Sequence, residues 1–96
     1  MLNNLGFKDY LDEINTKFYL VETGFEIELV EVTGKNFSPQ QEMFSLIFRG
    51  AKVNFLEQKI YHLSHEKLGD GELFLVPIAE AADGFKYEAI FNRLIS

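Results

Sequence analysis

Two histidines, His62 and His65, are the residues of this chain best suited to metal or proton chemistry. A His-x-x-His pair on a helix would place both rings on one side, where they could hold a metal ion. The residues around them alternate as in a strand, and strand residues three apart point to opposite faces. We therefore expect two exposed histidines near a strand end, with no metal site and no cofactor. The remaining alternative is one histidine that binds a metal together with a carboxylate such as Glu66.

Other side chains with catalytic chemistry stand in patterns that favour structural roles. Ser45 lies in Phe-Ser-Leu rather than in the Gly-x-Ser-x-Gly turn of a serine nucleophile, and no base is paired with it in the sequence. Glu26 and Glu28 would lie on one face of a strand, about 6.5–7 Å apart, a spacing that suits acid–base work on a sugar. Such a pair is far more common as a solvated strand face. We therefore expect no catalytic residue.

Arg49 is the most informative polar residue, because it closes an otherwise apolar strand immediately before Gly50. A guanidinium there can form a bidentate pair with a carboxylate such as Glu88 and tie two strands together. The other interpretation is a contact with a partner protein or with a ligand anion, in a pocket that also holds His65 and Tyr87. Arg49, His65, Tyr87 and Glu88 are therefore the candidate interaction or structural residues.

The first third of the chain is predicted to form a short helix followed by a β-hairpin. In residues 6–15, apolar side chains take the i, i+3, i+4 and i+7 positions of one helical face, namely Phe7, Tyr10, Leu11 and Ile14. The charged residues between them, Glu13 included, are expected to face solvent. Residues 17–23 and 25–32 predict a β-hairpin that turns at Gly24. Leu29 and Val30 are both apolar, so the alternation slips, which predicts a bulge or a strand covered on both faces.

Alternating apolar residues predict further strands in the second half of the chain. They lie at residues 42–49, 59–65, 72–78 and 87–91. Their connections are expected at residues 34–41, 51–58, 69–71 and 79–85. The run at 72–78 is almost continuously apolar, which is typical of a strand covered on both faces. Pro77 cannot donate a ladder hydrogen bond, so we expect this strand to lose a neighbour near its end, at an edge or a bulge.

Together these elements predict a mainly β (α+β) fold. About six antiparallel strands form a small barrel or a curled sheet, with one N-terminal amphipathic helix packed on it. We expect residues 1–96 to be a single domain, with residues 1–16 as the helical segment and residues 17–92 as the antiparallel barrel or sheet. The closure of the barrel and the oligomeric state stay open at this point.

Composition narrows the classes of function. The 96 residues carry nine Lys and Arg against fifteen Asp and Glu, which gives a net charge of −6 at pH 7. The acids are spread along the chain and no basic patch gathers, so nucleic-acid binding is not expected. The chain has no Cys, and it shows neither a signal-peptide pattern nor an apolar run of about 18 residues. These features predict a soluble, cytoplasmic protein that does not bind a membrane.

Four stretches of the second half carry a family resemblance. They are Phe-Ser-Leu-x-Phe-Arg-Gly at 44–50, Tyr-x-Leu-x-His-x-x-Leu-Gly at 61–69, Leu-Phe-Leu-Val-Pro-Ile at 73–78 and Tyr-Glu-Ala-Ile-Phe-Asn at 87–92. In combination, and over roughly residues 5–92, the chain resembles a family of small bacterial domains of unknown function. The resemblance includes His65 and implies a packing or hydrogen-bonding role for it. Members of this family occur in bacterial settings that include relatives of phage tail collar proteins, which implies a role in assembly.

The sequence therefore favours a non-enzymatic protein-interaction or structural module of a bacterial, phage-tail-like assembly, with a protein partner. Such a module would be cytoplasmic or incorporated in a virion or tail-like particle. The competing hypothesis is a small-molecule-binding β-barrel, or an enzyme, with a pocket around Arg49, His65 and Tyr87. Convergence of Arg49 and His65 on one concave cavity would favour ligand binding. Burial of both in paired hydrogen bonds, with an exposed apolar strand edge outside, would favour the module.

Overall fold

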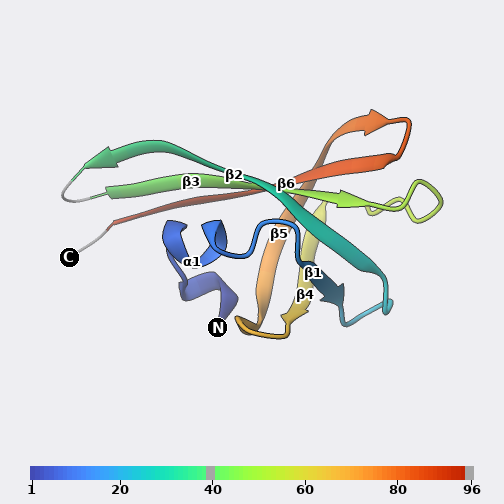
Figure 1. Ribbon diagram of the computed structural model, residues 1–96, viewed down its shortest axis with the longest axis horizontal. Helices are drawn as coiled ribbons and strands as arrows, with labels where there is room; N and C mark the ends of the chain where they lie inside the picture. The colour runs from blue at the N-terminus through green and yellow to red at the C-terminus, as the bar shows by residue number, and fades with distance from the viewer. Residues whose placement is uncertain (39–40, 95–96) are drawn as a thin grey trace.

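In a computed structural model that describes residues 1–38 and 41–94, the chain forms a closed β-barrel with a helical segment at its N-terminus (Figure 1). A 3-10 helix, η1 (Leu2–Asn4), and an α-helix, α1 (Phe7–Leu11), come first. In the described residues they are followed by six strands, β1 (Lys17–Leu20), β2 (Glu26–Ser38), β3 (Gln41–Gly50), β4 (Lys59–His65), β5 (Gly69–Ala81) and β6 (Gly84–Leu94). Neighbours pair antiparallel in the ring order β1-β2-β3-β6-β5-β4. The predicted mainly β fold is confirmed, and the sheet closes into a barrel.

Strand β5 changes its neighbour halfway along its length. Residues 69–75 pair with β4, and residues 76–81 pair with β6. A register shift between Pro77 and Ala79 follows closely after this change. Proline has no N–H to donate, so a bulge accommodates it where a regular ladder would not. The predicted loss of a neighbour near Pro77 is thus confirmed.

The outer face of β5 is open, so the prediction of a strand covered on both faces is wrong. Leu73 and Leu75 are buried, whereas Phe74 between them is 49% exposed. Apolar residues on the outer side of β5 made the run look like a buried strand, because sequence cannot tell an exposed apolar residue from a covered one.

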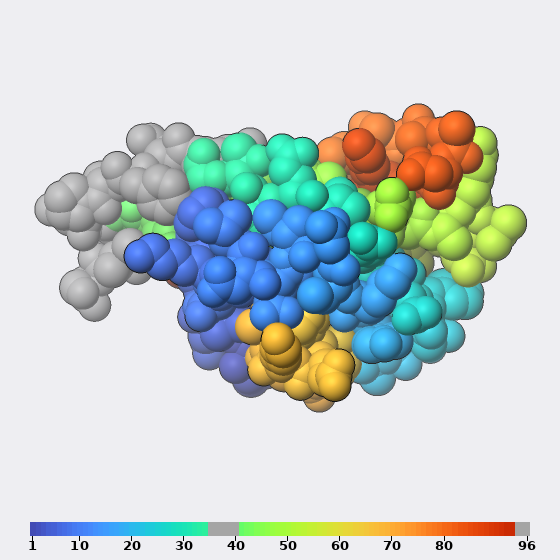
Figure 2. Space-filling view, in the orientation of Figure 1, coloured from blue at the N-terminus to red at the C-terminus, as the bar shows by residue number. Residues whose placement is uncertain are grey.

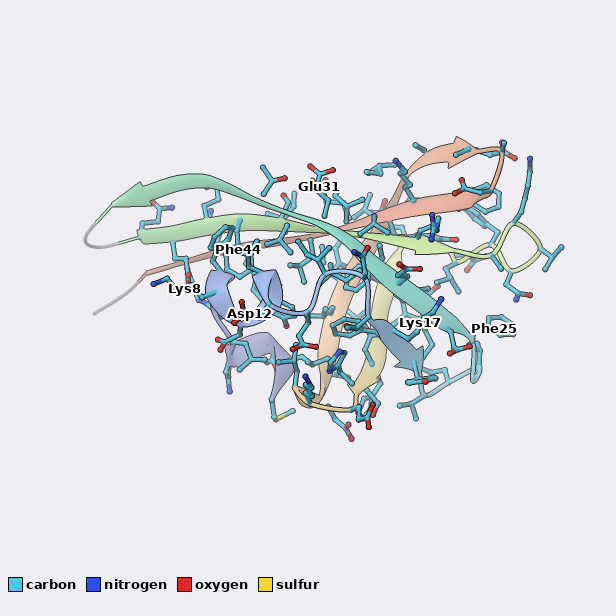
Figure 3. The ribbon with its side chains drawn as sticks, in the orientation of Figure 1. Lys8, Asp12, Lys17, Phe25, Glu31 and Phe44 are labelled. Carbon is cyan, nitrogen blue, oxygen red and sulfur yellow. The ribbon has the colours of Figure 1, made fainter. Side chains whose placement is uncertain are left out.

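The strands β2, β3 and β6 form a long arm, beneath which α1 lies (Figure 1). A register shift between Leu29 and Glu31 confirms a bulge where the alternation slips. Glu31 consequently projects from one side of the sheet while Phe44 faces α1 on the other (Figure 3). The arm also corrects the expected connector at 34–41, since β2 continues to Ser38 and β3 begins at Gln41. Pro39 and Gln40 lie outside the described residues.

The expected loop at 79–85 is also too long, because β5 runs to Ala81 and β6 begins at Gly84. Both errors share a physical cause. Small and polar residues such as Gly34, Ala79 and Glu80 have weak strand propensity, but backbone hydrogen bonds to an adjacent strand extend the ladder through them.

Aromatic rings make up much of the core. Phe44 of β3 stacks on Phe91 of β6 with ring centroids 4.7 Å apart, and Phe18 of β1 meets Phe48 of β3 edge-on at 5.2 Å. Offset and edge-to-face pairs of this kind stabilise a core by about 0.5–1.5 kcal/mol beyond the area that they bury. These aromatic side chains come from different strands, so their contacts join the strands across the interior of the barrel.

The N-terminal plug, defined as residues 2–14, fills the gap that opens where β5 leaves β6. In Figure 2 it covers the near face of the molecule between β2 and the β4–β5 turn. Leu2 is fully buried against Gly71 of β5, where an added Cβ would lie 2.6 Å from the Leu2 nitrogen. The Tyr10 hydroxyl donates to the Leu2 carbonyl at 2.5 Å, and Arg93 of β6 donates to the Asn3 carbonyl at 3.0 Å. The plug therefore bridges two strands that are not paired with each other at this level.

The helix within the plug is shorter than predicted from residues 6–15, because α1 ends at Leu11. Tyr10 is fully buried as expected, but Leu11 is 42% exposed. Glu13, expected to face solvent, is only 8% exposed. The chain then turns through Asn15, whose φ of 74° lies in the left-handed region that Asn tolerates better than most residues. This turn directs the chain into β1.

Candidate functional site

The candidate polar residues do not share one pocket. His65 lines a hollow of about 200 Å³, and Arg49 lines a second hollow of about 290 Å³. Lys17, labelled in Figure 3, lines both, so the two hollows are neighbours on the surface. Tyr87 is fully buried in the core. Arg49, His65 and Tyr87 therefore do not converge on one cavity, and the arrangement does not form the predicted pocket.

His65 ends β4 and turns its ring into the barrel. Alternation along the strand places it on the same face as Tyr61 and Leu63, and His62 lies on the opposite face as predicted. The ring packs on Phe18 with centroids 4.4 Å apart, and the side chain is 3% exposed. The expectation of an exposed histidine is therefore wrong for His65, because the strand keeps its inward face buried to its last residue.

Both ring nitrogens of His65 have hydrogen-bond partners. Nδ1 accepts the backbone N–H of Lys67 at 3.0 Å and that of Leu68 at 3.1 Å. An accepting Nδ1 in a neutral imidazole assigns the proton to Nε2, which lies 2.8 Å from Thr16 Oγ1. The Thr16 hydroxyl in turn donates to the Glu13 carbonyl at 2.7 Å. This series of hydrogen bonds ties the turn after β4 to the end of the plug.

Burial lowers the pKa of His65, because removal from water disfavours the imidazolium form. The carboxylates of Glu13 and Glu66 act in the opposite direction, and the ammonium of Lys67 acts with burial. Burial is the largest influence, so the ring is neutral at pH 7 and the tautomer above is the relevant form. His65 is engaged in structural contacts rather than poised as a base.

Arg49 lies on the outside of the barrel and joins two neighbouring segments. Its Nη2 donates to Glu28 Oε1 at 2.9 Å on β2, and its Nη1 donates to Asp83 Oδ2 at 3.0 Å in the β5–β6 turn. The hydrogen bond and charge of Glu28, followed by Asp83, raise the pKa of Arg49. Glu88 lies opposite Ile47 in the ladder. The guanidinium that we expected to pair with Glu88 instead pairs with Glu28 and Asp83.

Tyr87 anchors the loop between β3 and β4 from within the core. Its hydroxyl oxygen accepts the Leu56 N–H at 2.9 Å. Burial raises the pKa of Tyr87, so the phenol stays neutral. The ring also restricts Gly50, where an added Cβ would lie 3.1 Å from it. Tyr87 therefore helps to position the loop, and it contacts neither of the two hollows.

Comparison of the sequence with protein families gives one match. Residues 5–91 match the family described as Domain of unknown function (DUF6916). The chain belongs to that family. The predicted resemblance to a family of unknown function is thereby confirmed. Searches among curated proteins and among solved structures gave no match.

The DUF6916 match covers α1 and most of the barrel, so the hydrogen bonds of His65, Arg49 and Tyr87 lie within the matched region. No helix in the described residues is long and apolar enough to cross a membrane. Within the same residues, no group of three or more His, Asp or Glu side chains is placed to hold a metal ion.

Ser45 of the DUF6916 chain has no arrangement for nucleophilic catalysis. Its Oγ is buried and has no hydrogen-bond partner in the described part of the chain. Its partners in the ladders are Thr33 and Ile90, neither of which can act as a general base.

Sequence reasoning missed Glu13 and Thr16, which lie beside the His65 ring and line the same hollow. Helical periodicity placed Glu13 toward solvent, but Glu13 lies beyond the end of α1, where helical spacing no longer sets the direction of a side chain. Thr16 follows the turn at Asn15 and carried no motif. Glu13 and Thr16 become part of a site only because the β4–β5 turn packs against the segment that holds them.

Proposed function

We propose that this protein is a non-enzymatic protein-interaction or structural module that binds a protein partner through the outside of its barrel. The observation that carries the proposal is the exposure of three large apolar side chains on consecutive strands of the ring. Ile60 of β4 is 58% exposed, Phe74 of β5 is 49% exposed and Ile90 of β6 is 59% exposed. Together with Val76 they form what we call the outer stripe.

The outer stripe crosses β4 and β5 and reaches β6. Ile60 and Phe74 are directly opposite each other in the β4–β5 ladder, so their side chains stand side by side. Val76 follows on the same face of β5 and pairs with Glu88 of β6. Ile90 lies two residues beyond Glu88 and therefore on the same face. Single exposed apolar residues are ordinary, but a group on adjacent strands is typical of an interaction surface.

The hydrogen bonds and ion pairs of His65, Tyr87 and Arg49 support a binding module rather than an enzyme. His65 and Tyr87 are buried and hydrogen-bonded to backbone groups, and Arg49 is paired with two carboxylates. A catalytic pocket needs polar groups that converge on one cavity with free hydrogen-bonding capacity. These three residues lie in separate places and already have partners.

We further propose that the partner belongs to a bacterial, phage-tail-like assembly, and that the protein is cytoplasmic or incorporated in such a particle. The family resemblance of the four stretches supports this setting. A component of an assembly needs a lasting contact surface, and burial of one large apolar side chain contributes about 1.5–3 kcal/mol to such a contact.

Affinity purification of the full chain from its native cell, followed by mass spectrometry, tests the proposal. The wild-type chain should retain a protein partner in near-stoichiometric amount. Phe74→Glu should weaken that retention by about tenfold or more, because it removes apolar contact and buries a charge. Val53→Glu is the matched control, since Val53 is 88% exposed in the β3–β4 loop, away from the outer stripe. Recovery of no partner, or an equal loss in both variants, would overturn the proposal.

A further inference from the structure

Glu13 has a largely buried side chain, and its carboxylate oxygens accept no hydrogen bond from the described residues. Its side chain is 10% exposed, and Glu13 Oε1 lies 3.6 Å from Nε2 of the neutral His65 ring. That distance exceeds a normal hydrogen bond, and the Nε2 proton is directed to Thr16 Oγ1 at 2.8 Å. The carboxylate oxygens face the open hollow and stay in contact with solvent, so a cationic ligand must replace water there with a charge-assisted hydrogen bond, which is roughly twice as strong as a neutral one.

The hollow in front of Glu13 limits what such a ligand can be. It has a volume of about 200 Å³ and lies between the end of the plug, β1 and the β4–β5 turn. Pockets for complete metabolites or drugs are commonly about 300–1,000 Å³. The hollow is therefore sized for a head group of a few heavy atoms.

The charges around the hollow favour a cation at its inner end. Glu13 is the most buried charged group there, whereas the Glu66 carboxylate in the β4–β5 turn is exposed, so water screens its charge. Lys17 lines the rim, but its Nζ pairs with Glu28 at 3.4 Å. Lys67 is exposed, so water screens its charge. An anion would have to approach the Glu13 carboxylate where screening is weakest.

We propose that this hollow binds a cationic head group, an ammonium or a guanidinium, that donates hydrogen bonds to the Glu13 carboxylate. The same chemistry is available from a free amine or guanidine and from a Lys or Arg side chain of a protein partner. Ile60, Phe74, Val76 and Ile90 of the outer stripe do not line the hollow, so the site does not rest on the function proposed above.

His65 makes this binding depend on pH. The groups that face its ring are Glu13 and Thr16 from the segment before β1, Phe18 from β1, and Glu66 and Lys67 from the β4–β5 turn. A protonated ring would place a positive charge beside Glu13 and compete with the ligand for the carboxylate. Bound cation and protonated His65 therefore disfavour each other, and affinity should fall by up to about tenfold per pH unit as His65 becomes protonated.

Two-dimensional ¹H–¹⁵N NMR of the full chain tests the site with methylguanidinium chloride and n-butylammonium chloride as probes. At constant ionic strength, at least one probe should cause saturable shifts of the Thr16, Lys67 and Leu68 amides, whereas sodium acetate should not. Glu13→Gln should bind about tenfold more weakly or worse, because a charge-assisted hydrogen bond is lost. Glu66→Gln, which changes a carboxylate at the rim, should retain most of the affinity.

If Glu13→Gln fails to fold, the affinity of the wild-type chain measured as a function of pH still tests the site. Wild-type affinity should weaken as pH is lowered through the titration of His65, and the bound cation should lower the pKa of His65 further. A short peptide with a single Arg that binds tighter than methylguanidinium identifies a partner side chain as the source, and equal binding identifies the free cation. Absence of saturable shifts, shifts with acetate alone, or unchanged binding by a folded Glu13→Gln would overturn the site.

Phe74→Glu separates the cation site in the hollow from the protein contact proposed for the outer stripe. This variant should bind the cationic probes like the wild-type chain, because Phe74 does not line the hollow. Loss of the protein partner with intact probe binding would concern the outer stripe alone. Loss of probe binding in Phe74→Glu would contradict the independence of the hollow.

Discussion

The regions around His65 and Arg49 both lie at the end of a strand, but their environments are opposite. The side chain of His65 is 3% exposed and its nitrogens meet backbone N–H groups and a hydroxyl, whereas Arg49 is 38% exposed and meets two carboxylates. Water screens the ion pairs of Arg49 and can replace them. Water cannot easily replace the hydrogen bonds of His65. Burial, more than formal charge, thus determines which polar residue stabilises this fold.

The largest expected effect comes from His65→Ala. Removal of the ring leaves the N–H groups of Lys67 and Leu68 without their acceptor and opens a cavity beside Phe18. We expect the free energy of unfolding to fall by about 2–4 kcal/mol, as measured by urea denaturation. His62→Ala is the matched control on the opposite face of β4 and should cost about 0.5 kcal/mol or less. Equal losses in the two variants would contradict the contrast between buried and exposed sites.

A pH dependence of stability provides the next largest effect. The unfolded chain binds a proton at His65 near the ordinary pKa of 6.5, whereas burial lowers that pKa in the folded chain. The unfolded state therefore binds more protons between these two pKa values, so stability is complete above about 6.5 and falls as pH decreases below it.

The slope from this one group should reach at most about 1.4 kcal/mol per pH unit. Denaturation of the wild-type chain and of His65→Gln across the range from about pH 5 to about pH 8 isolates it, because other titrating groups are common to both. The difference in stability between the two chains should shrink toward low pH. A difference that grows toward low pH would mean that the folded state favours protonated His65.

The smallest expected effect is that of Arg49→Gln. Its ion pairs with Glu28 and Asp83 are partly exposed, so we expect a small loss of stability that decreases as salt is added. Urea denaturation at low and at high salt measures it. Lys52→Gln is the control, because the Lys52–Glu80 pair is longer, at 3.8 Å, and more exposed. Unfolding by Arg49→Gln would make the guanidinium a structural residue and would remove the contrast with His65.

Local sequence pattern predicted the features of the fold that depend on neighbouring residues. The bulge after Leu29 followed from two consecutive apolar residues, and the loss of a neighbour near Pro77 followed from its missing N–H. Alternation of apolar residues also predicted the strand at residues 59–65, and β4 has these bounds. The lengths of β2 and β5 were not predictable, because pairing with an adjacent strand carries both through residues of weak strand propensity.

The candidate site was predictable only in part. His65 and Tyr87 were named as candidates from the sequence, but their hydrogen-bond partners, Thr16 and Leu56, lie far from them in the sequence. The carboxylates that hold Arg49 come from β2 and from the β5–β6 turn, and Glu28 is its ladder partner. Register between distant strands sets such pairs, and one sequence does not specify that register uniquely.

By itself, the sequence determined a mainly β fold of antiparallel strands, because the alternation of apolar residues along a strand is a local property. Only the tertiary structure decided that the sheet closes, that the plug fills the gap between β5 and β6, and that Glu13 lies beside His65. These are contacts between segments distant in the chain. They depend on how the strands twist and pack around a shared core, and no pattern within either segment encodes that geometry.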